Sequence, residues 1–315
     1  MLRIHLCFAG RNETMLTYLS SEKIDPKLLE KIQTFHNTYP GSGQNTASAL
    51  RYLYYGKEVW EEALHALLCG ENLLLAGSKA TGKNVLAENL ACVFDRPCYN
   101  VSFHINMDST SMIGTDTFKN NEVVFRPGPV YQSAKTGGFC ILDEINMARN
   151  EALAVLHSVL DFRRTINVPG YEPITVHPAA RFIATMNYGY AGTRDLNEAL
   201  ASRFVIIHMP EIAEDNLMKL LLREFPDMKK SFAAQFAGLF TDIQLKCQGG
   251  ELTEKVLDLR GLLDAVRMIH NGLAPYAALD MGLTNKTFDV YEQTLIKDII
   301  TSRISKKTRS ESIFI

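Results

Sequence analysis

A glycine-rich segment is the part of this chain whose residue types point most directly to chemistry. It reads Gly77-Ser78-Lys79-Ala80-Thr81-Gly82-Lys83-Asn84 and lies between the apolar run 73–76 and a helical pattern that begins at Val85. A loop with the spacing G-x-x-x-x-G-K that lies between a strand and a helix is typical of sites where the backbone wraps the phosphates of a nucleotide. The glycines let successive N–H groups converge on an anion, and the helix N-terminus adds partial positive charge. Lys83 supplies a point charge for the outer phosphates.

Asn84 departs from the usual form of this pattern, in which a Ser or Thr hydroxyl follows the lysine and reaches Mg²⁺. An amide oxygen is also a hard ligand for this ion, and a water molecule can take the same place. The segment therefore predicts a nucleotide site, with Asn84 as a candidate Mg²⁺ ligand.

Two acidic residues follow a second apolar run. Asp143 and Glu144 come directly after the run 139–142. Because ligands of open parallel sheets lie outside the carboxyl ends of the strands, we expect Asp143 near Mg²⁺. Glu144 is then placed to orient and deprotonate a water that attacks the γ-phosphate. The alternative is a strand that ends in two solvated acids, and the glycine loop favours the catalytic interpretation.

Three further polar residues are candidates for contact with the phosphates. Asn187 follows the apolar run 181–186 and can bond the γ-phosphate or the attacking water, or simply occupy a turn. Arg203 ends a helical pattern, where it is either a local C-terminal cation or a guanidinium offered to a neighbouring subunit's nucleotide. Arg260 starts a later helix and can reach back to the phosphates, or pair with Asp258 or Asp264.

Strands and helices alternate around these residues, which predicts a parallel sheet covered by helices. Two segments interrupt the alternation and are expected to form β-hairpins that serve as contact loops: residues 117–125, turning at Asn120-Asn121, and residues 164–176, turning around Pro169-Gly170. The expected strands lie near residues 72–76, 98–103, 139–142, 181–186 and 204–209, and the helices between them include 84–94 and 151–161.

The alternation is confined to the middle of the chain. We expect an N-terminal helical extension over 1–50, which includes a helix that starts at Asp25-Pro26, and an α/β domain over 51–210. An all-helical domain over 211–304 and a flexible tail over 305–315 follow. The helical domain is expected to contain helices near residues 213–225, 227–241, 253–271 and 287–303.

Composition narrows the range of partners. The 315 residues carry a formal net charge of −2, which argues against a strongly electrostatic nucleic-acid surface. No stretch approaches about 20 consecutive apolar residues, so we expect no membrane span. The six cysteines form no C-x-x-C pair and indicate reduced thiols, so we expect a cytoplasmic protein.

Taken in order, these motifs resemble those of an AAA+ ATPase over about residues 50–300. Lys83 lies in the matching Walker A loop, Asp143 and Glu144 in Walker B, and Asn187 at sensor 1. Arg203 matches the arginine finger and Arg260 matches sensor 2 of the helical lid. The blocks 142–148, 184–187 and 196–204 resemble the MoxR branch, which carries inserts where the two hairpins fall.

The resemblance implies a three-layer α/β/α core with sheet order 5-1-4-3-2, followed by a smaller all-helical lid domain. It implies ATP and Mg²⁺ as cofactors and a homo-oligomeric ring, usually a hexamer, with ATP at the subunit interfaces. The adenine is expected between the lid and the segment Tyr55-Gly56-Lys57. MoxR-type ATPases act as chaperones that remodel a protein client, beside a partner with a von Willebrand A domain.

Two other classes of function stay open. One is a nucleic-acid motor related to restriction GTPases, against which the near-neutral charge counts. The other is a nucleotide-gated scaffold with weak hydrolysis, which Asn84 motivates.

Overall fold

Five short strands form the central sheet in the structure, a computed structural model that describes residues 15–41, 50–188 and 195–315. The strands lie in the order β2-β5-β8-β1-β9 and every neighbouring pair is parallel. If these five strands are numbered 1 to 5 in chain order, the sheet order counted from β9 is 5-1-4-3-2, as expected. The strands are β1 (Leu73–Ala76), β2 (Cys98–Ser102), β5 (Phe139–Asp143), β8 (Arg181–Met186) and β9 (Val205–His208).

Helices cover both faces of this sheet, which explains why the inner strands β1 and β5 are runs of apolar residues rather than alternating. Leu73 and Leu75 of β1 pack into one buried cluster with α1 (Met15–Ser21), α2 (Pro26–Thr38), α3 (Lys57–Leu68) and α4 (Lys83–Val93). Leu74 points to the other face and packs with a second cluster. That cluster includes residues of α5 (Thr110–Ile113), α6 (Pro129–Thr136), α7 (Asn150–Leu153), α8 (Leu156–Leu160) and α9 (Glu198–Ala201).

The expected single helix over 151–161 is wrong, because residues 154 and 155 form a turn between α7 and α8. Leu153 before the turn and Leu156 after it are buried in the same cluster. The expected helix at Asp25-Pro26 is confirmed, and Asp25 caps α2 by accepting a hydrogen bond from the Lys27 N–H at 2.9 Å.

Two buried arginines hold helix ends against the base of the sheet. Arg181 begins β8 and its Nε donates to the carbonyl of Leu67, at the end of α3, at 2.7 Å. Arg96 donates to the carbonyls of Thr136 and Gly137, at the end of α6, at 2.8 and 2.7 Å. Both guanidiniums therefore donate to carbonyl groups of a helix C-terminus, where no N–H of a following helical turn is available.

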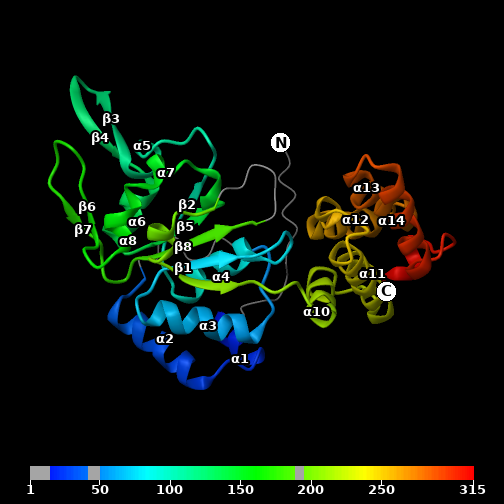
Figure 1. The fold of residues 1–315 in the computed structure, drawn as a ribbon. Coiled ribbons are helices and arrows are strands. Elements are labelled where there is room, and N and C mark those ends of the chain that lie inside the picture. The colour runs from blue at the N-terminus through cyan, green and yellow to red at the C-terminus, as the bar shows by residue number, and fades with distance from the viewer. Residues whose placement is uncertain (1–14, 42–49, 189–194) are drawn as a thin grey trace.

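Both expected hairpins are confirmed. The first pairs β3 (Gly114–Lys119) with β4 (Glu122–Pro127), and Asn120 and Asn121 form its turn with φ angles of 53° and 63°. The second pairs β6 (Thr165–Ile166) with β7 (Ile174–Thr175). Figure 1 shows the two hairpins projecting from the same end of the molecule. They contact each other, because the Tyr171 hydroxyl donates to the Asp116 carboxylate at 2.7 Å.

The chain after the sheet is helical and lies beside it (Figure 1). It contains α10 (Glu214–Glu224), α11 (Lys230–Gln248), α12 (Leu259–His270), α13 (Pro275–Gly282), α14 (Val290–Arg303) and α15 (Ser310–Ile313). We refer to these helices as the helical part. The expected helix 253–271 is a 3-10 turn, η2 (Glu254–Val256), followed by α12, and α13 was not expected. None of the described helices is both long and apolar enough to span a bilayer.

The expected flexible tail over 305–315 is wrong for its last six residues. Ile313 is fully buried, and its carbonyl accepts a hydrogen bond from the Lys229 N–H at 2.9 Å. The N–H of Ile315 donates to the carbonyl of Asp227 at 2.8 Å. The chain end is thus held against the start of α11 because one apolar side chain of the tail enters the core.

Candidate functional site

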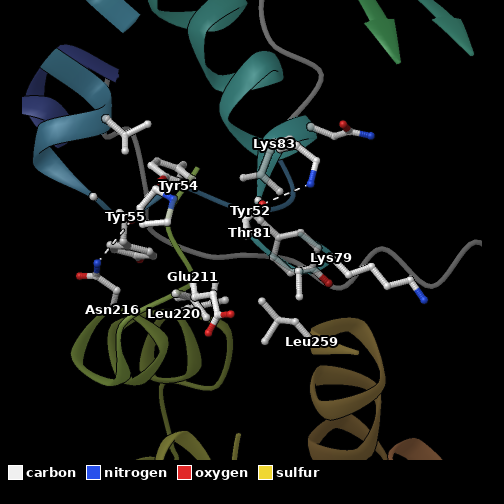
Figure 2. A pocket seen from close by; sticks show the side chains of 18 of the residues that line it. Tyr52, Tyr54, Tyr55, Lys79, Thr81, Lys83, Glu211, Asn216, Leu220 and Leu259 are labelled. Atoms are coloured by element: carbon white, nitrogen blue, oxygen red, sulfur yellow. Dashed lines mark hydrogen bonds between the residues drawn. The ribbon is translucent and has the colours of Figure 1, made fainter. Parts of the chain in front are cut away.

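A cavity of about 500 Å³ lies between the carboxyl ends of β1, β5 and β8 and the helical part. Figure 2 shows Lys83 and Thr81 on one side of it and Leu220 and Leu259 on the other. Its volume falls in the range of sites for small molecules, roughly 300 to 1,000 Å³. The lining comes from residues 52–59, the loop 79–85, the ends of β5 and β8, residues 210–220 and residues 257–263.

The glycine loop has the tight backbone that the sequence predicts. Gly82 precedes α4 with φ of 81°, and no side chain caps this helix, so its first N–H groups face the loop. A Cβ at Gly82 would lie 3.1 Å from the Tyr54 ring, and a Cβ at Gly77 would lie 3.0 Å from Met209. Both positions therefore leave little room for a side chain. The first N–H groups of α4 and its partial positive charge make this end of the cavity suited to an anion.

Lys83 lies across this loop. Its Nζ donates to the carbonyls of Gly77 and Ser78 at 3.0 and 2.6 Å and to the Thr81 hydroxyl at 3.2 Å. Burial lowers the pKa of Lys83 to about 8, while the negative charges of Asp143 and Glu144 act in the opposite direction. The structure thus places a buried ammonium at the centre of the loop, next to the two predicted acids.

Asp143 and Glu144 both line the cavity, as expected. Thr185 of β8 lies between them, although sequence reasoning did not select it. Its hydroxyl donates to Asp143 Oδ1 at 2.6 Å and accepts the Glu144 N–H at 3.0 Å. Inside a run of apolar residues, a β-branched Thr is typical of a strand interior, so the sequence carries no separate signal for this contact.

Asn187 also lies where the sequence places it. Its Nδ2 donates to Glu144 Oε1 at 2.9 Å, and its own carbonyl accepts a hydrogen bond from Asn146 Nδ2 at 2.8 Å. Glu144 has a φ angle of 55°, in the left-handed region that residues with a Cβ seldom adopt. Such backbone conformations persist where surrounding contacts hold them, and they are concentrated at functional sites.

The donor set at this end of the cavity fits Mg²⁺. Asp143 offers one carboxylate oxygen to Thr185, which leaves Oδ2 for a cation, and the Asn84 amide lines the same cavity. Carboxylate and amide oxygens are hard ligands of the kind that Mg²⁺ takes, usually together with water and phosphate oxygens.

Much of the remaining lining is aromatic and aliphatic. It includes Tyr52 and Tyr54, whose ring also lies against Gly82 of the glycine loop, and Leu220 of α10. Gly56, a predicted site residue, lines the cavity as well. Asn216 was not predicted. Its Nδ2 donates to the Tyr55 carbonyl at 3.4 Å, a distance longer than most hydrogen bonds of this type. Aromatic and aliphatic side chains together with the Asn216 amide suit a flat heteroaromatic ring.

The two candidate arginines occupy different places. Arg260 is exposed and lines the cavity, and neither predicted alternative partner holds it, because Asp258 pairs with Lys286 and Asp264 pairs with Arg267.

Arg203 is absent from the described lining of the cavity. Its guanidinium contacts the carbonyl of Ala199, the carbonyl of His157 at 3.3 Å and the Asp161 carboxylate at 3.6 Å. The structure therefore brings Arg260 to the lining of the chain's own cavity, and it does not bring Arg203 there.

Comparisons with known proteins find a matching family and similar relatives. Residues 72–204 match the family described as AAA domain (dynein-related subfamily). The uncharacterized protein YojN of Bacillus subtilis is 33% identical over 243 residues, covering 76% of this chain and 80% of that protein. The uncharacterized protein SAB1265c of Staphylococcus aureus is 34% identical over 248 residues, covering 77% of this chain and 94% of that protein.

A solved structure from Cytophaga hutchinsonii, described as that of a "putative ATPase", is similar with a TM-score of 0.46 and 16% identity. The match covers 94% of this chain and 96% of that one.

Proposed function

We propose that this chain, which belongs to the AAA+ ATPase family, hydrolyses ATP in the cavity between its sheet and its helical part. One observation carries the proposal. Three separate segments of the chain line the same cavity with Lys83, with Asp143 and Glu144, and with Asn187. A phosphate loop without an acid at the neighbouring strand end can bind a nucleotide, whereas this set also supplies a base for hydrolysis.

The proposed roles follow from the contacts. The triphosphate lies along residues 77–84, and Lys83 exchanges its bonds to loop carbonyls for bonds to phosphate oxygens. Asp143 and Asn84 hold Mg²⁺, which neutralises phosphate charge when it is bound. Glu144 accepts the proton of the attacking water, and Asn187, which now bonds Glu144, turns its amide towards the γ-phosphate or that water.

The finer assignment is a MoxR-type remodelling ATPase that works as a homo-oligomeric ring, most simply a hexamer, in the cytoplasm. The two exposed hairpins support contact with a protein client, and a von Willebrand A-domain protein is the partner we expect. We assign nucleotide binding to residues 51–210 and a lid to residues 211–304. Arg260 would then link the phosphates to lid movement, because it lines the cavity from α12.

Arg203 is proposed to act on the nucleotide of a neighbouring subunit. Its position outside the chain's own cavity supports this role, as does the partial exposure of its side chain, 23%. A guanidinium suits the charge that spreads over the oxygens of a transferring phosphoryl group.

Hydrolysis is tested by measuring phosphate release from ATP by the wild-type chain and by Glu144→Gln. The variant keeps the shape of Glu144 and loses the base. We therefore expect an ATP affinity within about threefold of wild type and a turnover that is at least about 100-fold slower. Equal rates for the two proteins would contradict hydrolysis and favour the scaffold interpretation. Salt-dependent binding of duplex DNA together with a preference for GTP would favour the nucleic-acid motor.

The role of Arg203 is tested by mixing two variants that are inactive alone. Glu144→Gln supplies an intact Arg203, and Arg203→Ala supplies an intact cavity. If Arg203 acts between subunits, the mixture regains activity, because some cavities with Glu144 then face a neighbour with Arg203. A mixture as inactive as its components would contradict a role of Arg203 at a neighbour's nucleotide.

A further inference from the structure

The Thr185 hydroxyl makes two hydrogen bonds whose directions are fixed by chemistry. The Glu144 N–H can only donate, so the hydroxyl oxygen accepts that bond at 3.0 Å. The single hydroxyl proton is then free to donate to Asp143 Oδ1, at 2.6 Å. Thr185 is 1% exposed, so water has little access to replace either bond. One side chain thus joins the carboxylate of Asp143 to the backbone of Glu144.

Each bond has a consequence for the neighbouring acid. The bond to Oδ1 leaves Oδ2 as the oxygen of Asp143 that can meet a cation. The bond from the N–H of Glu144 supports a backbone with φ of 55°, which is unfavourable for a residue with a Cβ. Because the backbone conformation sets the direction in which a side chain leaves the chain, this bond also helps to direct the Glu144 carboxylate. Asn187 holds the other end of that carboxylate at 2.9 Å.

We propose that Thr185 is a positioning residue, which couples the acid of the cation site to the acid that activates water. The inference rests on the proposed function and assigns a role to a residue that lies in the block 184–187 but to which the sequence analysis gave none. Thr185 does not itself take part in bond formation. Its hydroxyl keeps the two acids in one fixed geometry while the nucleotide binds mainly through the loop 77–84.

Thr185→Ser and Thr185→Ala are a matched pair for the test. Both variants remove the same methyl group, and they differ only in the hydroxyl. We expect Thr185→Ala to lower kcat about 10- to 100-fold, the range that the loss of a hydrogen bond to a charged group produces. ATP affinity should stay within about threefold of wild type, because the loop contacts are unchanged. Thr185→Ser should restore kcat to within about threefold of wild type.

A second measurement on the nucleotide-free protein is independent of turnover. Amide hydrogen exchange at Glu144 should be at least about tenfold faster in Thr185→Ala than in wild type, since the N–H loses its acceptor. The Ser variant should protect this amide as wild type does. Should Thr185→Ala fail to fold, Thr185→Val keeps the volume of the side chain, and the same two results are expected for it.

Three results would overturn the inference. They are equal kcat for the Ser and hydroxyl-free variants, an equal loss of kcat and ATP affinity in the hydroxyl-free variant, and unchanged exchange at Glu144. No hydrolysis by the wild-type chain would instead contradict the proposed function, and the exchange measurement would still report on the hydroxyl. Hydrolysis that is insensitive to Thr185 contradicts only this inference.

Discussion

Raising the pH above 8 should weaken ATP binding, because the cation that meets the outer phosphates loses its proton in the empty site. Burial lowers the pKa of Lys83 from its ordinary value of 10.5 to about 8, against the opposing charges of Asp143, Glu144 and Glu254. A bound triphosphate places further negative charge beside Nζ and raises this pKa again. Above pH 8, ATP binding must therefore take up a proton.

The size of the effect follows from the fraction of empty sites that hold the proton. With a pKa of about 8, the apparent Kd for ATP should double near pH 8 and rise about tenfold at pH 9. The stability of the empty protein should change in the other direction. Because the folded-state pKa of this base is depressed, the folded chain holds fewer protons, and the free energy of unfolding rises between about pH 8 and 10.5.

The assay is competition with a fluorescent ATP analogue at pH 7, 8 and 9, with EDTA present so that metal binding makes no contribution. Lys83→Arg is the control, since a guanidinium stays charged over this range. The slope of Kd against pH is compared between wild type and Lys83→Arg, because the absolute affinities of the two proteins can differ. A wild-type Kd that is constant from pH 7 to 9, or a slope shared with the Arg variant, would refute the reasoning.

Three further substitutions test other parts of the structure. Arg181→Met removes the donors to the carbonyls of Leu67 and Pro178 and should cost about 2–4 kcal/mol in urea unfolding, with ATP affinity unchanged. Ile313→Ala should also cost about 2–4 kcal/mol, since this side chain is fully buried; no change would restore the flexible tail. Asn216→Ala should weaken ATP binding about two- to tenfold in calorimetry while GTP binding changes less; equal losses would remove Asn216 from base recognition.

Much of the sheet follows from the sequence because its three inner strands, β1, β5 and β8, are buried on both faces. An uninterrupted run such as 73–76 is typical of a parallel strand, and the glycine loop and the acids at 143 and 144 then mark the same edge. The Asn120-Asn121 pair predicts a hairpin turn, because Asn tolerates the left-handed backbone. These signals are local in the chain, so one sequence is sufficient to find them.

Contacts between distant segments could not be predicted in this way. Thr185 and Asp143 are 42 positions apart, and nothing near Thr185 indicates that its hydroxyl meets a carboxylate on the next strand. In the sequence Arg181 is simply the first residue of a strand. Only the fold shows that its guanidinium donates to the Leu67 carbonyl at the end of α3. Ile313 follows a basic run at 306–309 that favours a solvated tail, and its burial depends on the surface that α11 offers.

The central claim is that one cavity holds a triphosphate between Lys83 and Glu144, and a crystal structure with Mg²⁺ and a non-hydrolysable ATP analogue tests it most directly. The account predicts phosphates along residues 77–84, Lys83 Nζ moved from the loop carbonyls to the outer phosphates, and Glu144 facing a water beside the terminal phosphorus. A nucleotide bound elsewhere, or a loop that stays closed on Lys83 at saturating analogue, would contradict it.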